Sequence, residues 1–175
     1  MRLYSAVRQR LSLKGRALQL LAQRDQSRVE LRTKLLRHAA REAGKSAEGE
    51  PDSDDGERRR AEVEALLDWL EAHRYLSAER FVEARVHARQ GRFGNRRIRA
   101  ELAHHGVTVS SEAARALAES ELQRASAVRE RRFELPPRDA AERAAQARFL
   151  AGRGFSPEVI VRLMKQLDQA RLMSS

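Results

Sequence analysis

The chain has no cysteine and is poor in helix breakers and aromatic residues: its 175 residues include four prolines, nine glycines and 5% aromatic side chains. Without cysteine, disulfides, thiolate nucleophiles and cysteine-ligated zinc are excluded. Because so few breakers interrupt it, the chain can form long helices around thin cores. No apolar run approaches the roughly 20 residues that a bilayer-spanning helix needs. These absences favour an all-α, cytoplasmic protein that does not contact a membrane.

The polar residues form no catalytic or metal-binding pattern. The five histidines are scattered, without the spacing of a metal site. The glycines at 152–154 match neither the dinucleotide-binding fingerprint nor the P-loop motif. No nucleophile, base and orienting residue can be grouped. We therefore expect a protein that is not an enzyme and that has no catalytic residues, metal site or cofactor.

Charge is abundant and unbalanced. Charged residues make up 34% of the chain, and the formal net charge is +10. Almost all the cations are arginines, whose guanidinium groups suit phosphates and acidic protein surfaces. A genome rich in arginine codons would also produce many arginines, but it would not by itself produce an excess of cations. The composition therefore favours a polyanionic partner over an ordinary solvated helical surface.

A short pattern occurs three times: an apolar helix end, a tight break, and a new helix with apolar residues four and eight positions after a capping residue. These positions are Ser27, Leu31 and Leu35, then Gly94, Ile98 and Leu102, and finally Ser156, Ile160 and Met164. A helical unit that cannot bury its apolar stripe alone is stabilised by stacking on its neighbours. The pattern predicts helical repeats in an elongated, solenoid-like molecule.

Composition divides the chain into segments. We expect a basic arm over 1–13, a first unit over 14–75, a second over 76–119 and a third over 120–175. The first unit contains an acidic insert at 44–57, which is rich in turn-forming residues and has no hydrophobe larger than alanine. Such a stretch cannot bury enough apolar surface to offset its ordering entropy. We therefore predict that the insert is flexible.

Arginines concentrate around the break of the second copy. Arg96 and Arg97 fall in the first helical turn, where cations oppose the helix macrodipole, whereas the other copies place Glu30 and Glu158 there. Because only the second copy departs from the preference for acidic residues in the first turn, the departure indicates a function. The free N–H groups at this helix start, together with the guanidinium groups, would bind an anion. The alternative for any single arginine is that it lies on a solvated helix face and binds no partner. The candidate partner-binding residues are Arg89, Arg92, Arg96, Arg97, Arg99, Lys34 and Arg153.

A second basic run, Arg129, Arg131 and Arg132, precedes Phe133. Cations are favourable at the negative end of a helix dipole. We interpret this run as a helix end.

Three signatures occur in order outside residues 1–13 and 44–57. The first comprises Leu20, Leu21, Ala22, Arg24, Ser27, Glu30, Leu31, Lys34 and Leu35. The second comprises Tyr75, Leu76, Arg80, Phe81, Arg89, Gly94, Arg97, Ile98, Arg99, Glu101, Leu102 and Gly106. The third comprises Phe149, Leu150, Arg153, Gly154, Phe155 and Ser156. In these signatures the chain resembles the RecX family, the bacterial modulators of the RecA recombinase, although Asn95 stands where proline is frequent.

The resemblance implies a curved, modular molecule of three tandem three-helix units. It also implies binding within the helical groove of the RecA–DNA filament, with lower ATPase and strand-exchange activity in DNA repair and the SOS response. Contact with single- and double-stranded DNA would be weak and non-specific, and the protein would act as a monomer.

One alternative is a helix-turn-helix transcriptional regulator, because a helix, a glycine turn and an arginine-bearing helix could enter a DNA major groove. Such regulators usually dimerise to match half-sites, and no heptad seam or dimerisation helix is recognisable in the sequence. Binding to a preferred operator would support the transcriptional regulator, whereas weak, salt-sensitive and sequence-independent DNA affinity would support the filament regulator.

Overall fold

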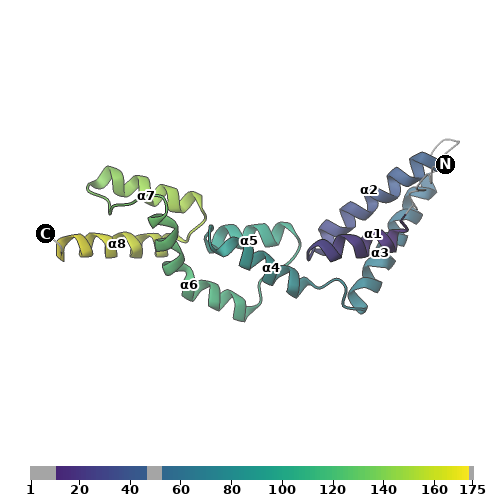
Figure 1. Cartoon of the computed structure of the whole chain (residues 1–175), viewed down its shortest axis with the longest axis horizontal. Coiled ribbons are helices and arrows are strands. Elements are labelled where there is room, and N and C mark those ends of the chain that lie inside the picture. Colours follow the sequence, from purple (N-terminus) through teal and green to yellow (C-terminus); the bar gives the residue numbers. More distant parts are fainter. Residues whose placement is uncertain (1–10, 47–52, 174–175) are drawn as a thin grey trace, which may run out of the picture. The chain divides into compact units, whose positions relative to one another are not determined.

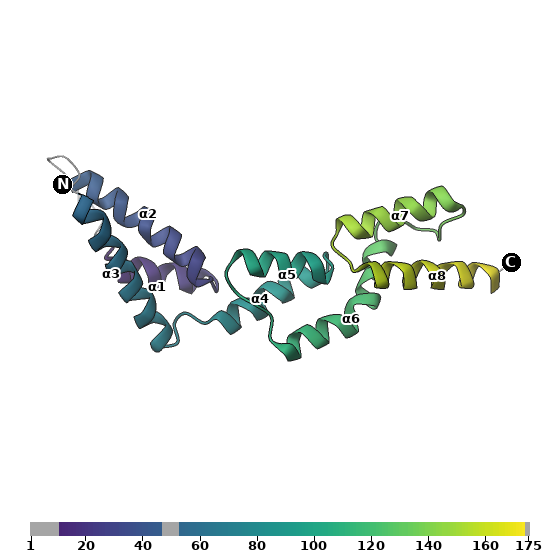
Figure 2. The same ribbon diagram turned by 180° about the vertical axis from the view of Figure 1, so that it is seen from behind.

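The computed structural model describes residues 11–46 and 53–173, and these residues form eight helices and no strand (Figures 1 and 2). The predicted all-α fold class is confirmed. Most of the predicted basic arm, residues 1–10, lies outside the described residues. The helices are α1 (Leu13–Gln23), α2 (Arg28–Ser46), α3 (Ser53–Ala72), α4 (Ala78–Gln90), α5 (Asn95–His104), α6 (Ser111–Glu130), α7 (Ala140–Gly152) and α8 (Pro157–Met173).

The chain divides into two compact units, an N-terminal unit (Met1–Phe81) and a C-terminal unit (Val82–Ser175), with the division inside α4. Within the C-terminal unit, α6 is one continuous helix that crosses the boundary predicted between residues 119 and 120. The end of the second repeat and the start of the third therefore share a helix. No helix among the described residues is long and apolar enough to cross a membrane.

In the N-terminal unit, α1, α2 and α3 pack together (Figure 1). They enclose one small aliphatic core. The hydroxyl of Ser27 accepts a hydrogen bond from the backbone N–H of Glu30 at 3.1 Å, which caps α2 as predicted. Leu31 and Leu35 are fully buried, as the repeat pattern requires. Aliphatic core residues contributed by the helices and the segment after α3 are Ala17, Leu20, Leu31, Leu35, Val63, Leu67, Leu70 and Leu76.

The predicted flexible insert over 44–57 is wrong at both of its ends. Helix α2 continues through Ser46, and α3 already begins at Ser53. Acidic side chains in a first helical turn are stabilised by the helix dipole, and Asp54 and Asp55 occupy that turn of α3. Asp54 also forms an i,i+4 ion pair with Arg58 at 2.6 Å. The acidic residues that suggested a loop therefore suit the start of a helix. The middle of the predicted insert, residues 47–52, lies outside the described residues.

The C-terminal unit has its own apolar core, built mainly from α6, α7 and α8. The repeat positions of α5 and α8 are buried as predicted: Ile98, Leu102 and Met164 are at most 2% exposed, and Ile160 is 8% exposed. Gly106 follows α5 with a φ of 70°, the left-handed conformation that commonly ends a helix. The core residues, all apolar, are Ala125, Val128, Leu150, Phe155, Ile160, Leu163 and Met164.

Candidate functional site

Two arginines bind the turn between α4 and α5: Arg124 within α6, and Arg131 directly after that helix. Arg124 donates hydrogen bonds to the carbonyl oxygens of Gln90 at 3.3 Å and Phe93 at 3.0 Å. Arg131 donates to the carbonyl oxygen of Gly91. These carbonyls lack helical partners, so the guanidinium groups satisfy them and fix the turn. The arginine-rich break of the second copy is thereby attached to the helices of the third.

Two glycines allow this turn to approach the loop between α7 and α8. The backbone N–H of Gly94 donates to the carbonyl of Arg153, and that of Arg96 donates to the carbonyl of Gly154, both at 3.0 Å. A Cβ on Gly94 would lie 2.2 Å from backbone atoms of Phe155. Only glycine permits so close an approach, and the approach brings two separate arginine-bearing segments together.

The arginines of these segments gather around aromatic rings. The guanidinium of Arg97 lies 4.4 Å from the centre of the Phe93 ring, and those of Arg153 and Arg92 lie 5.7 and 5.8 Å from it. Arg153 also lies 5.1 Å from the centre of the Phe149 ring. Cation–π contacts orient guanidinium groups without neutralising their charge. Arg89 lies 5.9 Å from the centre of the Phe93 ring as well. Four of the predicted residues, Arg89, Arg92, Arg97 and Arg153, are therefore brought together around this ring.

Beside this cluster lies a shallow pocket of about 220 Å³, which we call the arginine pocket. Its lining contains no carboxylate. Among the described residues, Arg92, Arg132 and Arg153 form no ion pair with any acidic side chain. The pocket therefore concentrates positive charge that no acidic side chain balances. Its lining residues are Arg92, Val128, Arg131, Arg132, Phe149 and Arg153.

The predicted anion site at the N-terminus of α5 is wrong, because that end is already occupied. The carboxylate of Glu121, which is 4% exposed, accepts hydrogen bonds from the backbone N–H of Asn95 at 2.9 Å and from its side chain at 3.0 Å. It also accepts from the backbone N–H and hydroxyl of Ser156, at 3.1 and 2.9 Å. Helix α6 thus supplies the carboxylate that the first turn of α5 lacks.

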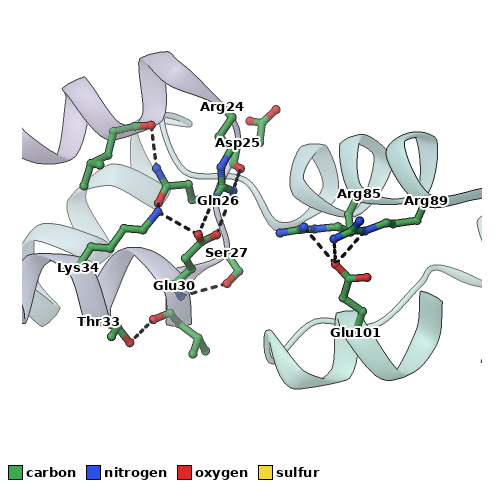
Figure 3. Close-up of polar contacts among 12 residues, drawn as sticks. Arg24, Asp25, Gln26, Ser27, Glu30, Thr33, Lys34, Arg85, Arg89 and Glu101 are labelled. Atoms are coloured by element: carbon green, nitrogen blue, oxygen red, sulfur yellow. Dashed lines mark hydrogen bonds and ion pairs between the residues drawn. The ribbon is translucent and has the colours of Figure 1, made fainter. Parts of the chain in front are cut away.

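Two candidate cations are held by acidic side chains of their own units (Figure 3). The Nζ of Lys34 donates to Oε1 of Gln26 at 2.8 Å and to Oε1 of Glu30 at 2.9 Å. The Nε and Nη2 of Arg89 donate to Oε1 of Glu101 at 3.1 and 3.0 Å. Carboxylates offset the charge of both, and neither lines the arginine pocket.

The two remaining candidates, Arg96 and Arg99, are exposed on α5 and do not line the arginine pocket. Arg96 instead borders a groove between α7 and α8. Neither side chain has an ion pair within the described residues. They extend the basic surface of α5 without joining the cluster.

The basic run Arg129, Arg131 and Arg132 marks a helix end and also contributes to the arginine pocket. Helix α6 ends at Glu130, as the run predicts, but Arg131 and Arg132 also line the arginine pocket. Arg129 is different: it is 3% exposed and donates to Oε1 of Gln146 at 2.9 Å. Three of the four Arg-Phe dipeptides in the chain, at 92–93, 132–133 and 148–149, contribute a lining or stacking residue. The fourth, at 80–81, does not, so the dipeptide is a partial sequence signal for the pocket.

Comparison with known proteins identifies the same family along the chain. A family model described as the third three-helix domain of RecX matches residues 118–164. A regulatory protein RecX of Ralstonia pickettii is 45% identical over 164 residues, covering 93% of this chain and 92% of the relative. The corresponding protein of Ralstonia nicotianae is 47% identical over 163 residues, covering 92% and 91%.

A structural comparison agrees at the level of the fold. The crystal structure of RecX from Lactobacillus salivarius superposes with a TM-score of 0.61 at 16% identity, covering 90% of this chain and 95% of the other. The sequence relationship to the Ralstonia proteins shows that the chain belongs to the RecX family of regulatory proteins.

Proposed function

We propose that this protein is a non-enzymatic regulator that binds in the groove of the RecA–DNA filament and lowers its ATPase and strand-exchange activity. It acts in the cytoplasm as a monomer, during DNA repair and the SOS response, without a cofactor. Relatives that are 41–47% identical to this chain over the aligned residues are named as regulatory proteins. Their shared name supports a regulatory role, and the arginine pocket supplies a chemical basis for it.

The single observation that carries the proposal is the set of arginines without carboxylate partners in the arginine pocket. Guanidinium groups held by aromatic rings and carbonyls are already oriented, so a bound anion does not have to order them. They form paired hydrogen bonds with phosphates or carboxylates. A DNA-bearing filament presents both kinds of acceptor, and weak, sequence-independent DNA contact follows from phosphate recognition.

The packing of α5 disfavours the alternative, a helix-turn-helix transcriptional regulator. A recognition helix inserts its N-terminal residues into the major groove. In this protein the first N–H groups of α5 are bonded to the carbonyls of Arg153 and Gly154 and to the carboxylate of Glu121. That end of the helix is covered by protein, so it is a poor candidate for reading base edges.

The proposal is tested with a triple charge reversal of arginines that line the pocket, Arg92→Glu, Arg132→Glu and Arg153→Glu. RecA ATPase on single-stranded DNA is measured against increasing concentrations of the wild type or the variant. We expect the variant to need at least about tenfold more protein for half-inhibition, since each lost charge-assisted contact is worth about 1 kcal/mol or more. A folded variant, verified by circular dichroism, that inhibits like the wild type would remove the arginine pocket from the mechanism.

A matched control carries the same change of charge on exposed arginines elsewhere: Arg37→Glu, Arg60→Glu and Arg115→Glu. These residues lie on α2, α3 and α6, outside the arginine pocket. We expect this control to retain most of the inhibition. Equal losses in both variants would mean that net charge, rather than the pocket, determines binding.

A further inference from the structure

A second surface of the C-terminal unit has a different chemistry from the arginine pocket. A groove of about 290 Å³ lies along α7 and α8, and we call it the α7–α8 groove. Phe155 and Ile160, both buried, form part of its lining together with Ala151, Pro157 and Val161. Val161 is 64% exposed, although it is an aliphatic residue in the middle of an apolar lining. The groove therefore leaves apolar surface in water that a partner's apolar side chain could cover.

The border of the groove is basic. Arg96 from the start of α5 and Arg148 from α7 contribute to its lining, and both are exposed. Neither forms an ion pair among the described residues. An apolar centre with a charged border is the usual anatomy of a protein–protein anchor site. The charge at this border favours an acidic partner.

The chain's own segments outside the described residues do not have this chemistry. Residues 1–10 carry three arginines and no acid, so the basic border would repel them. Residues 47–52 are acidic but contain no apolar side chain larger than those of alanine and proline. A second copy of the chain, with a net charge of +10 and the same basic border, would also be repelled.

The chemistry also favours protein over nucleic acid as the occupant. A nucleic-acid backbone presents phosphates, which suit the arginine pocket but not an apolar lining. We propose that the α7–α8 groove binds an apolar side chain carried on an acidic segment of a partner protein. This inference rests on the proposed function, under which the partner protein is the recombinase protomer itself. The α7–α8 groove would then contact the protein of the filament, and the arginine pocket would contact its DNA.

The inference is tested by substitutions at Val161, whose exposure on α8 allows polar replacements without loss of the fold. Co-sedimentation with RecA filaments on single-stranded DNA measures filament binding, and fluorescence anisotropy with an oligothymidylate measures DNA binding alone. Val161→Glu removes the apolar contact and adds repulsion toward an acidic segment, so we expect filament affinity to fall about tenfold. Val161→Lys removes the apolar contact but adds a cation that an acidic segment attracts, so a smaller loss of about threefold is expected. DNA binding should be unchanged in both variants.

The control is Leu172→Glu, the same kind of replacement near the end of α8 at a residue that is 79% exposed and outside the groove. We expect it to bind filaments like the wild type. The inference is overturned if Val161→Glu binds filaments as well as this control does, or if Val161→Lys is the weaker of the two Val161 variants. Failure of the wild type to bind filaments would instead count against the proposed function, which distinguishes the two results.

Discussion

The carboxylate of Glu121 bonds both the backbone and the side chain of Asn95, at 2.9 and 3.0 Å, and so closes the N-terminus of α5 from inside the protein. The same carboxylate accepts two hydrogen bonds from Ser156 at the start of α8. Two positive helix ends thus share one buried acid. The N-terminus of α5 therefore has a structural role. The positive charge available to a partner is carried by the arginines of the α4–α5 turn.

Replacing Glu121 by glutamine should destabilise the C-terminal unit. An amide can accept on one oxygen only, and its NH2 group would face the N–H donors of Asn95 and Ser156. We expect the free energy of unfolding to fall by about 2 kcal/mol, as for other buried groups left unsatisfied. Urea unfolding followed by circular dichroism measures the change. Glu119→Gln, at an exposed site on the same helix, is the control, and equal stability of the two variants would contradict the role of Glu121.

Glycine substitutions should have opposite effects at two positions. Gly94→Ala would place a Cβ within 2.2 Å of the backbone of Phe155, so we expect destabilisation of about 3 kcal/mol or more. Gly152 lies within α7 with no atom within 4 Å of an added Cβ. Gly152→Ala should therefore stabilise by about 0.5–1 kcal/mol. Thermal unfolding of both variants measures the difference, and a well-tolerated Gly94→Ala would contradict the close approach.

Acid should weaken the N-terminal unit through Glu30. Burial alone would raise its pKa, but hydrogen bonds from Arg24 and Lys34 outweigh burial and lower the pKa from 4.5 to about 2. The folded state keeps this carboxylate charged where the unfolded chain would protonate it. Its contribution is therefore complete above about pH 4.5 and is lost as the pH falls toward 2.

The contribution of Glu30 should be about 2 kcal/mol once solvent screening of the exposed Arg24 is allowed for. Urea unfolding between pH 6 and pH 2 measures it. In Glu30→Gln the loss of stability over the acid range should be smaller by that amount than in the wild type. Glu62→Gln, an exposed site on α3, should retain the full wild-type pH dependence. A Glu30→Gln variant with the wild-type pH dependence would contradict the assignment.

Contact between the arginine pocket and DNA phosphates should appear as salt dependence. Each phosphate contact on single-stranded DNA contributes about 0.7 to the slope of log affinity against log salt concentration. Arg92→Gln, Arg132→Gln and Arg153→Gln together should reduce the slope by about 2. Oligothymidylate titrations at several salt concentrations measure it. An unchanged slope would mean that these arginines do not contact phosphate, and would favour acidic protein residues as their partners.

Much of the fold was predictable because local rules determine it. The capping residue Ser27 and the apolar repeat positions Leu31 and Ile98 follow from short-range patterns, and the structure places each as expected. The acidic insert was mispredicted at its ends because acidic and turn-forming residues also suit a helix start, as Asp54 illustrates.

The site was predictable only in part because it depends on long-range contacts. The break of the second copy pointed to Arg92 and Arg97, but it could not indicate that α6 supplies a carboxylate to the N-terminus of α5. That contact joins residues 26 positions apart. Similarly, Arg132 lines the arginine pocket because α6 packs beside α7, a pairing that no local pattern encodes.

The most direct measurement is RecA ATPase on single-stranded DNA, titrated with wild-type protein, the arginine-pocket triple reversal and its charge-matched control. Inhibition by the wild type and the control, with at least about tenfold weaker inhibition by the triple reversal, is the expected result. A wild type that leaves RecA ATPase unchanged at saturating concentration would contradict the proposed regulation. Equal inhibition by all three proteins would contradict the role of Arg92, Arg132 and Arg153 in it.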